Sequence, residues 1–71
     1  MRSRSVRAKD VCAGDRLVMV NPRNGREFSR EINEVHVNKY DVLIIYKDGS
    51  ESEGYHFARL NKKPLHKVRV K

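Results

Sequence analysis

The chain has 71 residues, of which 38% are hydrophobic and 35% are charged, and its formal net charge at pH 7 is +7. This length allows one small domain, and no apolar run reaches the roughly 18–20 residues that a membrane-spanning helix needs. Cys12 is the only cysteine, which excludes an intrachain disulfide and a zinc site built from paired thiolates. We therefore expect a cytoplasmic protein with no membrane partner.

The first half of the chain predicts strands joined by turns. Residues 11–20 combine a Gly-Asp turn with a short apolar run rich in β-branched residues, which is typical of a strand. Residues 21–25 (N-P-R-N-G) concentrate turn formers, and the Asn-Gly pair suits positive φ in a hairpin. Residues 32–37 alternate between apolar and polar as a strand does, whereas residues 28–33 also allow a helix.

The second half continues this pattern. Residues 40–46 (Y-D-V-L-I-I-Y) form the most hydrophobic segment and predict the central strand. Residues 47–50 (K-D-G-S) predict a hairpin turn, after which residues 51–57 return as a strand. Residues 58–61 resemble a single helical turn, and an extended segment at residues 65–71 ends the chain.

Two short motifs resemble those of SH3-like small β-barrels. The string V-x-x-G-D-x-L-V beginning at Val11 is similar to the opening of KOW-type barrels. The string Y-K-D-G-S-x-S beginning at Tyr46, followed by Tyr55, is similar to the distal hairpin of Tudor-like members. The resemblance covers residues 8–70 and implies that the first and last strands lie close together, so that the basic segments at the two ends converge on one pole.

Together, the elements and the resemblance predict a mostly β fold. We expect a five-stranded SH3-like small barrel at residues 8–71, with one short helical turn before the last strand. Residues 1–7 are expected to form a flexible basic arm in front of this single domain.

The charge of the chain is concentrated at its two ends. Residues 1–10 carry four cations against one acid, and residues 59–71 carry six cations and no acid. Residues 11–58, in contrast, carry six cations against eight acids. In residues 65–71 the valines and the cations alternate, so the last strand should present its cations on one face. Such a one-sided distribution is typical of a protein with a polyanionic partner.

The candidate nucleic-acid contacts are the cations of the two terminal segments, because phosphate binding by such groups releases condensed counterions. They are Arg2, Arg4, Arg7, Lys9, Lys62, Lys63, Lys67, Arg69 and Lys71. Secondary contacts are expected in the first loop, at Arg23, Arg26 and Arg30. Glutamates that alternate with these arginines compete with phosphate for them. DNA is favoured over RNA, because an Arg-rich arm suits a duplex groove and no exposed stacking platform for unpaired bases can be identified.

The aromatic residues leave three uses open. Tyr46 and Tyr55, if exposed across the hairpin, would stack on bases, or would form a cage for a methylated cation as the Tudor-like resemblance suggests. Packing is favoured for Tyr55 and Phe57, because so small a barrel needs most of its aromatic side chains in the core.

Residues that carry catalytic or metal chemistry are isolated from one another. His36, His56 and His66 lie in different predicted strands without the spacing of a metal site, and Cys12 has no neighbouring base. We therefore expect a non-enzymatic protein with no metal and no cofactor.

Two alternative functions stay open. One is a protein-protein interaction module, such as a small regulatory or phage-type accessory protein whose barrel edge or acidic hairpin (Asp48, Glu51 and Glu53) binds a larger enzyme. The other is a ribosome- or translation-associated RNA-binding barrel, which the KOW-like opening implies. SH3-like barrels host both kinds of partner, so the surface and not the fold decides between them.

Overall fold

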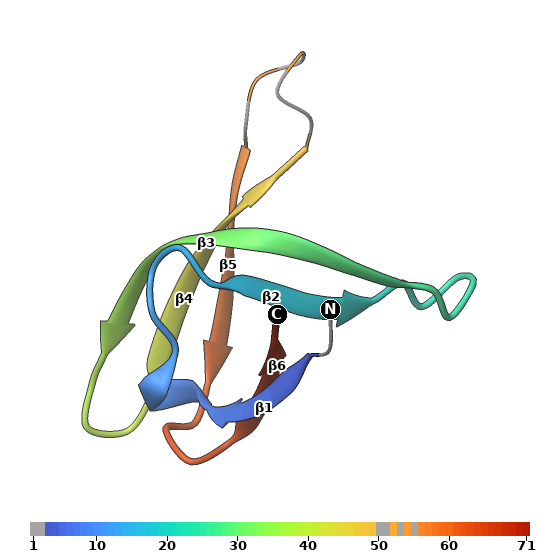
Figure 1. The fold of residues 1–71 in the computed structure, drawn as a ribbon. Helices are drawn as coiled ribbons and strands as arrows, with labels where there is room; N and C mark the ends of the chain where they lie inside the picture. The colour runs from blue at the N-terminus through green and yellow to red at the C-terminus, as the bar shows by residue number, and fades with distance from the viewer. Residues whose placement is uncertain (1–2, 50–51, 53, 55) are drawn as a thin grey trace.

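The computed structural model describes residues 3–49, 52, 54 and 56–71. Six strands form one open antiparallel sheet in the order β1-β6-β2-β3-β4-β5 (Figure 1). The elements are β1 (Arg4–Arg7), the 3-10 turn η1 (Ala8–Asp10), β2 (Arg16–Val20), β3 (Glu27–Val37), β4 (Val42–Asp48), β5 (His56–Lys62) and β6 (Lys67–Val70). The prediction of a mostly β chain is confirmed. The sheet has six strands where five were expected.

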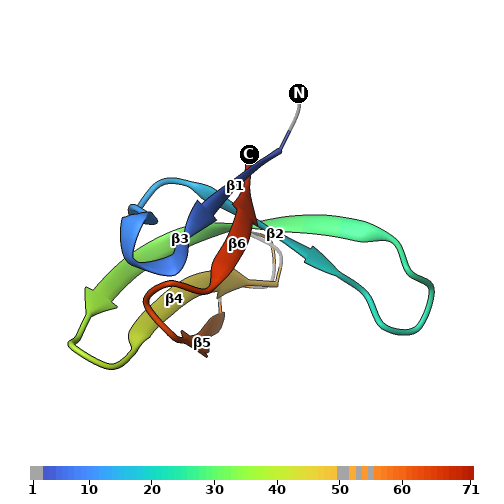
Figure 2. The same ribbon diagram turned by 90° about the horizontal axis from the view of Figure 1, so that it is seen from below.

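Strand β3 is the longest element and connects the two halves of the sheet. Residues 27–31 pair with β2, residues 32–37 pair with β4, and the register shifts between Ile32 and Glu34. Such a bulge bends a strand and increases its twist. The bend lets β1, β6 and β2 lie across from β4 and β5 (Figures 1 and 2). Residues 28–33, which also allowed a helix, belong entirely to this strand.

The core lies between the two halves. Its largest fully buried side chains are Leu17, Ile32, Val42, Ile44 and Val70. They come from β2, β3, β4 and β6, so each half contributes its inward face. In β4, buried Val42 and Ile44 alternate with less buried neighbours, as the period of a strand requires.

The helical turn predicted at residues 58–61 is wrong. These residues belong to β5, which pairs with β4 continuously from Asp48 opposite His56 to Val42 opposite Lys62. Ala58 and Leu60 are partly buried, whereas the residues between and after them are exposed. This alternation is that of a strand with one face turned to the core. The 3-10 turn η1 lies instead near the other end of the sequence.

Residues 4–7, which lie in the segment expected to be a flexible arm, form strand β1. Val6 lies opposite Val68 of β6, and Arg4 lies opposite Val70. Beyond β1, the amide of Ala8 donates to the carbonyl of His66 at 2.8 Å. The first and last segments of the described chain are therefore neighbours in space, as the resemblance implied.

The hairpin turn expected at residues 21–25 is present between β2 and β3. Gly25 has a φ of 69°, a backbone conformation that residues with a Cβ rarely adopt. Its amide donates to the carbonyl of Asn21 at 2.8 Å. Figure 1 shows this hairpin projecting away from β1 and β6. Within the described ranges, no helix has the length and apolar character needed to cross a membrane.

Candidate nucleic-acid interface

The pairing of β1 with β6 sorts their side chains onto two faces. Residues directly opposite each other in an antiparallel pair share a face. Val6 and Val68 form one such pair, and Val68 is only 8% exposed, so their face is the core side. Arg7 and Lys67 form the next pair, on the opposite face, and both are exposed. The alternation predicted for the last strand is thus present.

Arg7 and Lys67 place two positive charges side by side. The Cβ atoms of directly opposite residues lie roughly 5 Å apart, and two residues of like charge in such a pair destabilise the pairing of the strands. In the part of the chain that the structure describes, neither side chain forms an ion pair with a carboxylate. An anion bound between them would remove this repulsion.

Three further cations lie on the segments next to this pair, in η1, at the end of β5 and in the β5–β6 loop. The amide of Lys9 donates to the carbonyl of Pro64 at 3.1 Å, which fastens η1 to the loop between β5 and β6. The same loop is closed by a 3.0 Å hydrogen bond from the amide of His66 to the carbonyl of Lys63. The strand register and these contacts bring together a set that we call the loop cluster, made of Arg7, Lys9, Lys62, Lys63 and Lys67.

Arg69 is engaged within the protein. Its guanidinium donates to both carboxylate oxygens of Glu27, at 2.7 and 3.2 Å, and to Ser3 Oγ at 2.9 and 3.2 Å. This hydrogen bonding and the positive charge of Arg69 lower the pKa of Glu27 below its usual value, with a smaller contribution from Lys71. Reciprocally, the Glu27 carboxylate raises the pKa of Arg69. Arg69 therefore offers less free charge than the sequence suggested.

The remaining terminal cations lie at the opposite end of the β1–β6 pair from Arg7 and Lys67. Arg4 is exposed opposite Val70, and Lys71 directly follows that residue. The amide of Lys71 donates to the carbonyl of Arg16 at 2.9 Å, which ties it to the start of β2. Arg2 lies outside the described residues. The terminal cations thus form two groups, one at each end of β1 and β6.

The secondary contacts proposed in the first loop separate into two kinds. Arg23 and Arg26 are exposed in the turn of the β2–β3 hairpin, which projects away from the loop cluster (Figure 1). Arg30 instead lies on β3, where its Nε donates to Asp48 at 3.2 Å and its guanidinium lies 4.7 Å from the centre of the Phe28 ring. Arg30 is thus held by internal contacts, and the interleaved glutamates expected to compete for it are not its partner.

The described aromatic side chains differ in exposure, and Tyr40, in the β3–β4 loop, is 79% exposed. Tyr46 is partly buried and packs against the core, as expected for a small domain. Phe57 is 57% exposed on β5, against the expectation that it would be packed. Tyr55, with the hairpin acids Glu51 and Glu53, lies outside the described residues.

Candidate catalytic and metal-binding side chains are dispersed. Among the described residues, no group of three or more His, Cys, Asp or Glu side chains is placed to hold a metal ion. His36 contacts Glu34 at 3.2 Å on the exposed face of β3. Cys12 is exposed in the segment between η1 and β2.

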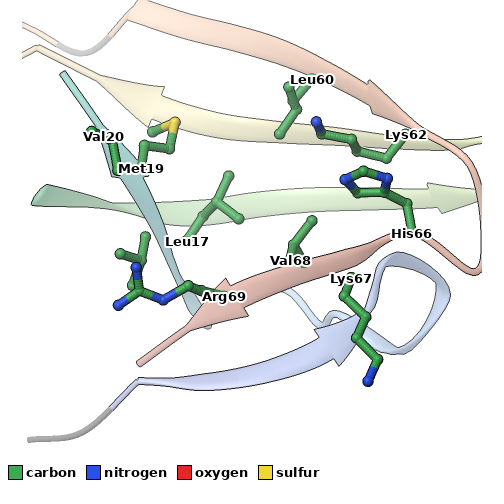
Figure 3. Close-up of a pocket in the computed structure, with 10 residues that line it drawn as sticks. Leu17, Met19, Val20, Leu60, Lys62, His66, Lys67, Val68 and Arg69 are labelled. Carbon is green, nitrogen blue, oxygen red and sulfur yellow. The ribbon is translucent and has the colours of Figure 1, made fainter. Parts of the chain in front are cut away.

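The structure also has a groove that sequence reasoning missed. It has a volume of about 430 Å³ and lies between β5 on one side and β2 and β6 on the other. Figure 3 shows Leu60 and Lys62 of β5 facing Leu17 of β2 and Val68 of β6. Assigning residues 58–61 to a strand would have placed Leu60 and Lys62 on one face and revealed one wall.

Comparison of this chain with protein-family models, with curated proteins and with solved structures found no match.

Proposed function

We propose that this chain is a non-enzymatic, cytoplasmic SH3-like small β-barrel that binds the phosphate backbone of nucleic acid, with duplex DNA as the favoured ligand. The observation that carries the proposal is the placement of Arg7 directly opposite Lys67 with no carboxylate partner among the described residues. Two unneutralised cations on adjacent strands are an unfavourable arrangement in the free protein. A phosphate group bound between these two cations would attract both of them and so offset their mutual repulsion.

The arrangement of the strands supports the barrel assignment. Without β1, the strand order is β6-β2-β3-β4-β5, in which the last strand lies beside the first strand of the remaining five. The bulged β3 lets the two halves enclose one core. In this description β1 is an addition to the barrel that covers the outer edge of β6.

The composition of the loop cluster supports backbone binding over reading of bases. It consists of five cations, whereas the exposed aromatic residues Tyr40 and Phe57 belong to the β3–β4 loop and to the start of β5. Phosphate contacts position a protein on a duplex without specifying sequence. Unpaired bases are held mainly by stacking on aromatic rings. We therefore expect weak sequence preference and a ligand whose bases stay paired.

Salt titration of duplex binding tests the proposal. If all five cations contact phosphates, the logarithm of the binding constant should fall with the logarithm of salt concentration with a slope of about −4.5, measured by fluorescence anisotropy between about 50 and 200 mM salt. Lys67→Glu should reduce this slope by about 2, because it removes one contact and pairs the new carboxylate with Arg7. Arg23→Glu, the same charge change in the β2–β3 turn, is the control and should reduce the slope by at most about 1.

Three results would contradict parts of this proposal. Absence of duplex binding at about 50 mM salt would refute nucleic-acid binding, since the electrostatic attraction is strong at that concentration. Equal losses in Lys67→Glu and Arg23→Glu would show that net charge, and not the loop cluster, governs binding. Tighter binding to a structured RNA than to a duplex DNA of equal length would replace DNA with RNA as the ligand.

A further inference from the structure

The groove between β5 and the β2–β6 pair is a feature of the described surface that phosphate binding leaves unexplained. Its floor includes Leu17 and Val68, which are 2% and 8% exposed. Its walls include Met19 of β2 and Leu60 of β5, which are partly buried and pack against the core. The groove is therefore an apolar hollow continuous with the core.

Six of the ten residues that line the groove are aliphatic, three are Lys or Arg and one is His. None is Phe, Tyr or Trp, and none is acidic. Nucleic-acid bases are bound by stacking on flat rings, and the groove offers no ring except the imidazole of His66. Branched or linear side chains such as Leu, Ile or Met fit it better, because aliphatic surfaces gain from burial without a stacking geometry.

One end of the groove is cationic. Lys62 and His66 lie together there, as Figure 3 shows, and Lys67 follows on the next position of the chain. Neither Lys62 nor Lys67 forms an ion pair with a carboxylate in the described part of the protein. An occupant with a carboxylate at this end would supply the missing negative charge.

The strand that forms one wall also has an unpaired edge. β5 is the last strand of the sheet and pairs with β4 alone. Every second backbone amide and carbonyl along its free edge is therefore available to a further extended chain. An extended segment added there would direct alternate side chains toward one face.

We propose that this groove binds an extended acidic segment of a partner protein, with an aliphatic side chain seated between Leu17, Met19 and Leu60 and a neighbouring carboxylate held by Lys62 and His66. The six aliphatic residues and the lack of Phe, Tyr and Trp favour an aliphatic side chain over a base, and the cationic end favours an acidic segment over a basic one. The proposal does not depend on nucleic-acid binding. Because Lys62 belongs to both sites, a bound segment and a bound duplex should compete.

Selection and mapping together test the groove. A phage-displayed library of random decapeptides selected on the full chain should yield sequences in which a Leu, Ile or Met lies beside Asp or Glu. Addition of the selected peptide, made synthetically, should shift the methyl NMR signals of Leu17, Met19, Leu60 and Val68. Enrichment of basic peptides, or shifts that avoid these methyl groups, would overturn the proposal.

Two matched substitutions separate the groove from the loop cluster. Lys62→Glu should weaken peptide binding about tenfold, because it removes a charge-assisted contact. Lys63→Glu is the control, since Lys63 does not line the groove, and it should leave peptide affinity within about twofold. Both substitutions should reduce the salt slope of duplex binding by similar amounts, so the two proposals can fail separately. Equal loss of peptide affinity in both variants would contradict the groove site.

A third variant tests the apolar wall. Met19→Ala should weaken peptide binding roughly fivefold by removing buried aliphatic contact, with the fold checked by the NMR spectrum of the free variant. Sodium decanoate serves as a second probe, because it carries an aliphatic chain and a carboxylate without a peptide backbone. Methyl shifts produced by decanoate and not by any selected peptide would replace the protein partner with a small amphiphile.

Discussion

Glu27 determines how much of the charge of Arg69 is available on the surface of β6. The two side chains form a bidentate ion pair, a geometry that fixes both groups. The contact lowers the pKa of Glu27 below its ordinary value of 4.5. At a given acidic pH the Glu27 carboxylate is therefore more ionised than an unpaired glutamate, and it stays paired with Arg69 at neutral pH.

Removing the Glu27 charge should strengthen nucleic-acid binding. Glu27→Gln leaves Arg69 without its anionic partner and restores a cation on the face that carries Lys67. We expect the magnitude of the salt slope for duplex binding to rise by about 1, as expected for one added phosphate contact. The measurement is the same anisotropy titration.

Glu34→Gln is the matched control for this substitution. It removes the same charge from an exposed position of β3, where the partner is His36. The slope should then stay within the error of the wild-type value. Equal increases in both variants would assign the effect to net charge and not to release of Arg69.

At this scale the sequence predicted which residues are cations but not which of them are free. Arg30 and Arg69 look like their neighbours in the sequence. Their partners, Asp48 and Glu27, lie 18 and 42 residues away. Such contacts depend on strand register, which a list of charged residues does not contain. The exposed cations Arg7 and Lys67 stayed available because their register places them opposite each other.

In the β1–β6 pair, the two opposite cations that serve the proposed function also lower the stability of the strand pairing. Two cations in directly opposite positions weaken the pairing of two strands of four residues each. Four backbone-paired positions are few, so each side-chain pair matters. A protein selected for stability alone would have an acid at one of these positions.

Lys67→Glu should therefore stabilise the folded state while it weakens duplex binding. The substitution replaces a like-charge pair with an opposite-charge pair, and we expect the free energy of unfolding to rise by roughly 0.2–1 kcal/mol. Urea denaturation followed by circular dichroism measures this change. Lys63→Glu, in the loop, provides the control and should leave stability nearly unchanged. A loss of stability in Lys67→Glu would contradict the placement of residue 67 opposite Arg7.

Prediction of the elements succeeded where periodicity was clear. Val68 and Val70 are buried and alternate with exposed Lys67 and Arg69, as the sequence indicated. Prediction failed at residues 58–61 because A-R-L-N contains no β-branched residue and carries local features of a helical turn. Pairing with β4 along its whole length overrode this local preference. Strand β1 was missed for a related reason, because it pairs with residues 60 to 66 positions away.

In the whole molecule, few residues are buried compared with the number that are exposed. Only nine hydrophobic residues of the described chain are buried, which is a small number even for a domain of this size. Each fully buried side chain therefore contributes a large share of the net stability. Ile44 is central among them, because it is fully buried on the middle segment of β4.

Ile44→Ala should lower the free energy of unfolding by about 3 kcal/mol, because it combines lost burial with a cavity. The matched surface substitution is Val37→Ala at the end of β3, where the side chain is 56% exposed. That change should cost less than about 0.5 kcal/mol. Urea denaturation at constant pH compares the two variants. Similar losses would mean that the core does not lie between the two halves of the sheet.

The overall arrangement was the part most accessible from the sequence. The barrel resemblance implied that the ends meet, and β1 does pair with β6. The groove was not accessible, because it requires β5 to face β2 and β6 across the bend of β3. No pattern within a single segment encodes that approach.

The start of β1 and the end of β6 lie side by side, which has a consequence for any larger assembly that contains this chain. Arg4 and Val70 are opposite each other, so anything tethered before β1 or after β6 leaves the domain from the same corner. The Arg7–Lys67 pair lies at the far end of these strands, about 10 Å away at 3.4 Å per residue. A domain fused to either end of the chain would therefore lie away from the loop cluster and would leave it accessible to a ligand.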